Sequence, residues 1–462
     1  MARPMMPRLR NCGRCIFRRR LRSSSPRTAS RRGVSAAAAG GFSVIVERLL
    51  ILWHFIATRW LPAPRDREKR LRRFLAEAPH FADVMTKPLF LEHFAALNRH
   101  GITLEQATAV ALRAERERDF KPELPGGITA GLSSGTSGAR QVFLVGREDR
   151  CRWAGQMMAR MLSTASLCRI WNFFTPPLRI AFFLRASSNL YTTLSSLRLK
   201  FEYFDLTRPF KELLTRLDDY RPHVLVAPAT VLAELARSAR ARPKQVISVA
   251  EVLDAKDRAA IEQAFGVRVA EIYQAAEGFL GCTCTHGRMH LNEESLHIEP
   301  QWLDERHERF HPLITDFSRQ TQWFVRHRLD DILRLDPTPC PCGRKTMTLR
   351  GIEGRAEEVL WLRDASGALS PVFPDVLRQA LYTQPVGLYR IEQHGLRWEV
   401  RLLNGDEKAV QSALEALLDG LRLEQPELQF LPWTDQPSSE KQKRIRCSLK
   451  PSTPPETPAA CK

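Results

Sequence analysis

A run of serine, threonine and glycine is the sharpest chemical signal in this sequence. It consists of Ser133, Ser134, Gly135, Thr136, Ser137 and Gly138, and the β-like run QVFLV follows it. The two glycines let the backbone turn tightly with its amides pointing inward, while the hydroxyls can bond phosphate oxygens. The run is neither a Walker A motif, because no Lys-Ser/Thr follows the second glycine, nor a Gly-x-Ser-x-Gly nucleophile elbow. It predicts a phosphate loop, with an ordinary surface turn as the alternative.

A second signal is a carboxylate at the end of an apolar run. In the segment EIYQAAEG, which begins at Glu271, Glu277 follows Tyr273 by four residues. Open α/β sheets bind ligands at the carboxyl ends of their strands, so this carboxylate could hold Mg²⁺ against phosphates, and Tyr273 could stack on a base. A surface glutamate and a core tyrosine without any function are the alternative.

The third signal consists of two charged segments, RHRLDDI at 326–332 and GIEGRAEEVL at 351–360. An aspartate in such a segment is suited to accept hydrogen bonds from both ribose hydroxyls, and an arginine can bridge to ribose or phosphate. A solvated run of charges is the alternative interpretation.

Four of the ten cysteines form two C-x-C pairs, Cys282 with Cys284 and Cys340 with Cys342, and His290 follows the first pair. In a chain of this size without a recognisable signal peptide, clustered thiols favour a metal over disulfides. Thiolates with one imidazole suit tetrahedral Zn²⁺. Four sulfurs are one possible ligand set, and three sulfurs with His290 are another.

The elements that must position these residues follow an α/β pattern. The segment from about Leu61 to Pro125 has a helical apolar period, after which short β-like runs alternate with helical ones to about Leu349. This alternation predicts an α/β domain with largely parallel strands. Residues 358–445 then form strands and helices of a small α+β unit, and the Pro/Thr-rich end of the chain is expected to be disordered.

In order and spacing, these signals resemble the adenylate-forming superfamily of acyl-CoA synthetases, especially its phenylacetate-CoA ligase and coenzyme F synthetase-like branch. The resemblance covers roughly residues 125–446 and implies an α/β fold. It predicts a basic tail or mis-assigned start at 1–41, a large ATP- and acid-binding domain at 42–352, a small mobile α+β lid domain at 353–446, and a disordered tail at 447–462. The hinge is expected near Glu357.

The resemblance also implies roles for individual residues in nucleotide binding. The loop from Ser133 to Gly138 is expected to wrap the ATP phosphates. Tyr273 is expected to stack near adenine, Glu277 to bind Mg²⁺, and Asp331 to bind the ribose.

Further nucleotide contacts follow from shorter similarities. Ala250 and Glu251 resemble the adenine-contacting Gly-Ala-Glu turn of the family. Arg140 takes the place of the usual lysine beyond the phosphate loop, and Arg355 belongs to a segment similar to Gly-Arg-x-Asp-Asp.

The resemblance assigns the catalytic lysine and the metal as well. Lys441 lies in a segment similar to Gly-Lys-x-x-Arg, whose lysine reaches the acyl carboxylate and the α-phosphate. Members of the branch carry similar Cys/His and Cys-Pro-Cys-Gly elements, which implies a structural zinc. Two departures are that Ala276 replaces the common Ser or Thr and that no glycine precedes Lys441.

The function these roles imply is ATP-dependent activation of a carboxylic acid as its acyl-adenylate, followed by thioester formation with CoA or an acyl carrier protein. Aromatic residues from Trp171 to Phe183 leave an aromatic acid open as the substrate, although core packing is their more ordinary use. No nucleic-acid partner is expected, and the enzyme is predicted to be cytoplasmic.

The net charge of +19 favours a rival, a zinc-stabilised nucleic-acid-binding protein, and a catalytically degenerate relative is a further alternative. However, eleven arginines and no acidic residue lie between Met1 and Gly33, so most of the excess belongs to the tail. The apolar stretch 42–60 is interrupted by Glu47, Arg48 and His54, which predicts an amphipathic helix on the core or peripherally on a bilayer, and not a membrane span.

Overall fold

The computed structural model describes residues 36–61, 66–119, 124–133, 140–184, 196–434 and 444–448, with side chains from residue 45 onward. Residues 44–462 form one compact unit and residues 1–43 another. The helices are α1 (Ala36–Trp60), α2 (Arg67–Glu77), α3 (Lys87–Glu92), α4 (Leu104–Glu117), α5 (Arg147–Met161), α6 (Thr164–Trp171), α8 (Phe210–Tyr220), α9 (Ala229–Ser238), α10 (Ala255–Phe265), the 3₁₀ turn η1 (Ala356–Glu358), α11 (Pro374–Tyr382) and α12 (Glu407–Leu421).

The described strands form one large sheet and several small ones. The strands are β1 (Thr129–Leu132), β2 (Val142–Val145), β3 (Leu178–Leu184), β4 (Leu199–Asp205), β5 (Val224–Ala227), β6 (Gln245–Ser248), β7 (Val269–Ala275), β8 (Gly278–Thr283), β9 (Met289–Leu291), β10 (Leu296–Trp302), β11 (Arg309–Asp316), β12 (His327–Arg328), β13 (Asp331–Leu335), β14 (Thr348–Arg355), β15 (Leu360–Arg363), β16 (Leu369–Val372), β17 (Val386–His394), β18 (Arg397–Gly405), β19 (Glu427–Leu431) and β20 (Ile445–Cys447). In the large sheet the order is β10-β11-β13-β14-β9-β8-β7-β6-β5-β3-β4, and β12 pairs with β11.

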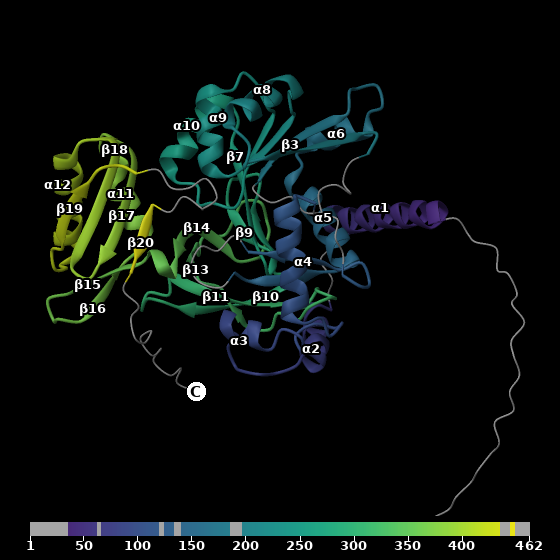
Figure 1. Cartoon of the computed structure of the whole chain (residues 1–462), viewed down its shortest axis with the longest axis horizontal. Helices are drawn as coiled ribbons and strands as arrows, with labels where there is room; N and C mark the ends of the chain where they lie inside the picture. Colours follow the sequence, from purple (N-terminus) through teal and green to yellow (C-terminus); the bar gives the residue numbers. More distant parts are fainter. Residues whose placement is uncertain are drawn as a thin grey trace, which may run out of the picture. The chain divides into compact units, whose positions relative to one another are not determined.

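One half of the large sheet is parallel, as the alternation of helices and strands predicts. Strands β4, β3, β5, β6 and β7 pair in parallel. Successive residues of β3 enter different cores: Ile180 and Phe182 pack with α1, α5 and α6, whereas Ala181 and Phe183 pack with α8, α9 and α10 (Figure 1). Burial on both faces explains why these strands are continuous apolar runs in the sequence.

The other half of the sheet is antiparallel, so the expectation of largely parallel strands as far as Leu349 was wrong there. From β7 onward, the pairs β7–β8, β8–β9, β9–β14, β14–β13, β13–β11 and β11–β10 are all antiparallel. Short connections are the physical reason for the pairs β7–β8, β8–β9 and β10–β11, because parallel neighbours need a crossover of a dozen or more residues.

The C-terminal part has a core of its own. Its four-stranded sheet has the order β19-β18-β17-β20, and α11 and α12 pack with it. Val410, Leu414 and Leu418 are spaced by four residues on α12 and all are fully buried, as is Trp398 on β18. The α/β architecture with a smaller α+β C-terminal domain is therefore confirmed.

Helix α1 confirms the helix predicted for residues 42–60. Its Ile51 and Phe55 are buried against residues of α5. In the part of the chain that the structure describes, no helix is long and apolar enough to cross a membrane. The two helices approach closely at Gly155 of α5, where a β-carbon would lie 2.6 Å from the carbonyl oxygen of Ile51 and 2.9 Å from the amide nitrogen of Phe55.

We expect Gly155→Ala to destabilise the protein by about 1–3 kcal/mol, because the added methyl group overpacks the contact between α1 and α5. Gly420→Ala in α12 is the matched control, since no atom lies within 4 Å of its added β-carbon. The control should gain about 0.5–1 kcal/mol from helix propensity. Thermal unfolding of both variants checks this, and an equal rise in Tm for both would contradict the packing described.

Candidate active site

Three residues predicted to bind nucleotide meet at the edge of the large sheet. Asp331 begins β13 and is the ladder partner of Arg355 at the end of β14. The Tyr273 hydroxyl of β7 donates to Asp331 Oδ2 at 2.7 Å, and Arg355 Nε donates to Asp331 Oδ1 at 3.2 Å. Tyr273 and Arg355, which are 58 and 24 residues from Asp331 in the sequence, thus each bind one oxygen of its carboxylate.

Tyr273 is buried in the core between the antiparallel strands, with 6% of its surface exposed. Burial and the neighbouring Asp331 raise its pKa well above the usual value, so the hydroxyl stays protonated and acts as a donor. In this structure Tyr273 therefore orients Asp331. Its predicted contact with adenine stays a prediction.

Glu277 lies in the turn between β7 and β8 and is buried against His327. Its Oε1 is 3.2 Å from His327 Nε2, and the two side chains are 5% and 1% exposed. Burial alone would raise the pKa of Glu277, but the hydrogen bond and charge of His327 outweigh burial and lower the pKa. His327 was not predicted from the sequence, because only the aspartate and the arginines of the segment 326–332 were considered.

A signal for His327 was nevertheless present in the sequence. In the segment after Val325, the charged Arg326, Arg328 and Asp330 alternate with His327 and Leu329, and the structure buries the latter two. This alternation is typical of a strand with one buried face.

The predicted phosphate loop is closed at its base. Ser133 N donates to Gln141 O at 2.8 Å, and Gln141 N donates to Ser133 Oγ at 2.9 Å. The Gln141 side chain in turn lies 3.4 Å from His327 Nε2, so the base of the loop and Glu277 contact the same imidazole. The other loop residues, Ser134 to Gly138, lie outside the described residues.

The side chain of Arg140 is already bound within the protein at the base of this loop. Its guanidinium donates to both carboxylate oxygens of Glu115 on α4, at 2.7 and 2.6 Å, and its Nε donates to Ser133 O at 2.8 Å. Such a bidentate pair fixes the side chain. In this structure Arg140 braces the loop, and its predicted phosphate contact stays a prediction.

The turn at Ala250 and Glu251 follows β6, on the same sheet edge as Glu277. Ala250 has a left-handed backbone with φ of 65°. Glu251 Oε2 accepts from Thr230 N at 3.0 Å and from Thr230 Oγ1 at 2.8 Å, at the start of α9. Glu251 thus links the ends of two parallel strands, and contact with adenine stays a prediction. Lys441 lies outside the described residues.

Four of the five predicted zinc ligands converge. The ligand atoms of Cys284, His290, Cys340 and Cys342 all lie within 4.8 Å of one another. Cys284 Sγ is 3.6 Å from Cys340 Sγ, and Cys342 Sγ is 3.3 Å from His290 Nε2. These separations approach the edge of about 3.8 Å of a tetrahedron with zinc–sulfur bonds of about 2.3 Å.

Two similar turns present the sulfurs. Gly287 N donates to Cys284 O at 2.9 Å and Gly343 N donates to Cys340 O at 3.1 Å, and both glycines have a φ near +80°, which favours glycine. His290 Nδ1 contacts Thr346 Oγ1 at 3.1 Å, which leaves Nε2 directed at the sulfurs. A histidine held in this way is common at metal sites.

Cys282 is not part of this cluster, which corrects its inclusion among the zinc ligands. Its side chain is fully buried in the core under α1 and α5. Burial raises the pKa of its thiol, which disfavours the thiolate that a metal needs. Of the two arrangements considered, the structure assembles three sulfurs with His290.

Comparison with known proteins bears on the fold. No protein-family model and no curated protein matches the sequence. Two structures of 2-hydroxyisobutyryl-CoA ligase in the postadenylation state, one with 2-HIB-AMP and one with R3-HIB-AMP, match with TM-scores of 0.54 and 0.53. Each is 18% identical to this chain, and the alignments cover 88% of this chain and 90% of that chain.

At this identity the likeness establishes the fold, and the fold is that of 2-hydroxyisobutyryl-CoA ligase. The fold that the sequence motifs imply is therefore confirmed. Assignment to the phenylacetate-CoA ligase branch stays a prediction.

A charged cluster lies beside the predicted hinge, where η1 follows β14. Arg309 Nε donates to Glu353 Oε2 at 2.7 Å and lies 3.4 Å from Asp375 of α11, and Arg334 lies 3.7 Å from Glu353. Burial, followed by the charge of Asp375, raises the pKa of Glu353 to about 7.

Because the pKa of Glu353 is higher in the folded state than its reference value of 4.5, the folded chain holds this proton more tightly. We expect the stability from this group to be full below pH 4.5 and to be lost as the pH rises through 7, by on the order of 1 kcal/mol. Glu353→Gln should remove this part of the dependence, as measured by thermal unfolding between pH 4.5 and 8.

Glu308→Gln is the control for this experiment, because a hydrogen bond from Arg334 lowers the pKa of the partly buried Glu308. The contribution of Glu308 to the free energy of unfolding therefore changes only at lower pH. If Glu353→Gln leaves the profile unaltered between pH 4.5 and 8, the raised pKa is refuted.

Proposed function

We propose that this protein activates a carboxylic acid with ATP, forming an acyl-adenylate and pyrophosphate. The observation that carries the proposal is the Asp331 carboxylate, oriented by Tyr273 and Arg355 at the sheet edge that also bears Glu277. The adenylate-forming fold supports it, as does the 2-HIB-AMP complex of the ligase with the similar fold.

In the proposed complex, Asp331 accepts hydrogen bonds from the ribose hydroxyls, and Arg355 bridges to ribose or phosphate. Charge-assisted hydrogen bonds of this kind are short and strong. The turn at Ala250 and Glu251 lies beside adenine together with Tyr273. The loop from Ser133 to Gly138 surrounds the phosphates with backbone amides and hydroxyls.

In the first step, an oxygen of the substrate carboxylate attacks the α-phosphorus, and the bond to the pyrophosphate oxygen breaks. Lys441 is proposed to neutralise the charge that develops on the substrate carboxylate and the α-phosphate. Glu277 is the residue that would hold Mg²⁺, and bound Mg²⁺ would neutralise charge on the phosphate oxygens. Because Glu277 Oε1 already contacts His327 Nε2, the carboxylate would have to bind Mg²⁺ and His327 at the same time.

In the second step, a thiol of CoA or of an acyl carrier protein attacks the acyl carbonyl and AMP leaves, which gives a thioester. The similar fold of a CoA ligase supports this acceptor class. The lid domain, residues 353–446, is proposed to turn about Glu357 between the two steps. The identity of the acid is left to experiment.

We also propose a structural zinc held by Cys284, His290, Cys340 and Cys342. The set contains three sulfurs and one imidazole, and these four ligands would complete a tetrahedral site without an open position for water or substrate. Such closed sites are typical of structural zinc. Bound zinc would tie the turn after β8 to the segment that precedes β14.

We expect acid-dependent exchange between ATP and labelled pyrophosphate, tested with a panel of aryl and aliphatic acids. Glu277→Ala and Lys441→Ala should each lower the exchange rate at least about 100-fold, since each removes charge stabilisation from the reacting phosphate. Asp331→Asn should raise the KM for ATP about tenfold.

Glu271→Ala is the matched control, because Glu271 lies on the same strand as Tyr273 but pairs with Arg258. Its exchange rate should stay within about twofold of wild type. If ATP binds but no acid supports exchange, the chain is a catalytically degenerate relative. If ATP does not bind, the proposal fails, and binding of nucleic acid by the basic chain is to be tested.

For the zinc site, we expect about one zinc per chain by metal analysis of the purified protein. Cys340→Ser should lose most of this zinc and lower the Tm, because the ligand set is broken. Cys282→Ser and Cys168→Ser should retain it. Equal loss of zinc from Cys282→Ser and Cys340→Ser, or a protein without zinc, would contradict the proposed ligands.

A further inference from the structure

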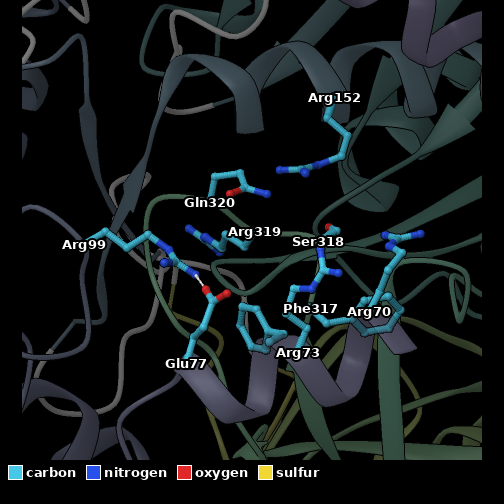
Figure 2. Close-up of a pocket in the computed structure, with 10 residues that line it drawn as sticks. Arg70, Arg73, Glu77, Arg99, Arg152, Phe317, Ser318, Arg319 and Gln320 are labelled. Atoms are coloured by element: carbon cyan, nitrogen blue, oxygen red, sulfur yellow. Dashed lines mark hydrogen bonds and ion pairs between the residues drawn. The ribbon is translucent and has the colours of Figure 1, made fainter. Parts of the chain in front are cut away.

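A cavity of about 340 Å³ lies next to α2 and is lined by an unusual number of arginines. Figure 2 shows Arg70 and Arg73 entering from α2, Arg99 from the connection between α3 and α4, Arg152 from α5, and Arg319 from the turn after β11. The guanidinium groups therefore come from separate segments of the chain and surround one space.

Arg319 is the most deeply buried of these side chains, with 1% of its surface exposed. Its Nη1 donates to the carbonyl oxygens of Ala276 and Glu277 at 3.1 and 3.2 Å, and its Nη2 donates to Leu144 O at 2.6 Å. Nε is buried and has no hydrogen-bond partner within the described part of the chain. A guanidinium stays charged in proteins, and the nearby carboxylates of Asp149, Asp316 and Glu277 stabilise the charge of Arg319.

Two of the other arginines are paired with carboxylates. Arg99 donates to Glu77 Oε2 at 3.0 Å, and Arg152 pairs with the fully buried Asp149. These ion pairs fix the two guanidinium groups in place without adding net charge to the cavity.

Arg70 and Arg73 have no carboxylate within 4.0 Å among the described residues, and their spacing of three places both on one face of α2. Arg70 stacks on the ring of Phe317 at 5.2 Å. The carboxylates of Asp149, Asp316 and Glu277 act on the buried Arg319, and Glu77 pairs with Arg99. Within the described part of the chain, the positive charges of the cavity without a carboxylate partner are therefore those of Arg70 and Arg73.

We propose that this cavity binds the diphosphate group of a small anionic ligand. A guanidinium group can donate two parallel hydrogen bonds to the oxygens of one phosphate. Arginines that enter the cavity from separate segments can therefore bind both phosphates of a diphosphate. The uncompensated charge and the small volume favour such a compact anion over an acidic protein surface. The site is separate from the proposed nucleotide site, since none of its lining residues was assigned there, although Arg319 also supports the turn that carries Glu277.

The test is calorimetric titration of the full chain with inorganic pyrophosphate. Arg70→Glu/Arg73→Glu should weaken binding at least about tenfold, because it removes two charge-assisted contacts and adds repulsion. Arg72→Glu is the matched control: Arg72 is on the same helix, does not line the cavity, and is a 76% exposed partner of Glu68. Thr136→Ala, which removes a hydroxyl from the proposed phosphate loop, reports on the candidate nucleotide site, and both of these variants should bind pyrophosphate as wild type does.

Two further titrations identify the source of the diphosphate. Binding of ADP as tightly as pyrophosphate would point to a nucleotide, whereas weaker binding of ADP would point to free pyrophosphate, and both agree with the proposal. Orthophosphate should bind more weakly than pyrophosphate, because it offers one phosphate.

The proposal is overturned if wild type binds no pyrophosphate at millimolar concentration, if the double variant binds as tightly as wild type, or if Thr136→Ala alone abolishes binding. Circular dichroism checks that the double variant is folded. Should it not fold, the single exposed substitution Arg73→Gln replaces it, with a loss of at least about threefold expected. A folded Arg73→Gln with unchanged affinity also overturns the proposal.

Discussion

Strand β7 pairs in parallel with β6 and antiparallel with β8, and the candidate active site depends on this double pairing. Parallel pairing brings the carboxyl end of β7 to the edge where β5 and β6 also end, beside Thr230 and Glu251. Antiparallel pairing returns the chain at once into β8, so that Glu277 lies in a tight turn at that edge. Through β8, β9 and β14, the same ladder brings β13 and Asp331 into reach of Tyr273. One strand therefore aligns groups from both halves of the sheet.

The charged groups around the candidate active site are buried or partly buried, and burial alone would disfavour their charged forms. Taking an ion out of water costs several kcal/mol unless partners compensate it. Glu277 has His327, Asp331 has Tyr273 and Arg355, and Arg319 has three carbonyl oxygens. The result is a set of dipoles and charges fixed before any ligand arrives, which is the condition for strong electrostatic stabilisation of a reacting phosphate.

Much of the architecture could be predicted, because local patterns determine it. The β-like run QVFLV and the helical run FKELLTRLDDY predicted β2 and α8, and the order and spacing of the motifs indicated the adenylate-forming fold. What failed depends on contacts that are distant in sequence. The C-x-C spacing does not reveal that Cys282 faces the core while Cys284 faces the metal-binding turn. Likewise, the pairing of Arg140 with Glu115 requires the β1–β2 hairpin to lie against α4.

The contacts of the C-terminal part with the large domain suit the proposed turning of a lid. The C-terminal core consists of residues from Leu360 onward, so it shares no apolar cluster with the large domain among the described residues. Charged contacts join the two instead. Arg444 lies 2.5 Å from Asp254 and 3.0 Å from Asp257 at the start of α10, and Arg309 reaches Asp375.

Partly exposed ion pairs of this kind are worth about 0–1 kcal/mol each, far less than the burial of an apolar core. They can define one position of the C-terminal part and still break at small cost. Arg444, which binds α10, is three residues after Lys441 and belongs to the same Lys-x-x-Arg segment of the sequence. A turn of the C-terminal part about Glu357 would break the ion pairs of Arg444 with Asp254 and Asp257, so the proposed change between the two steps depends on one pair of carboxylates.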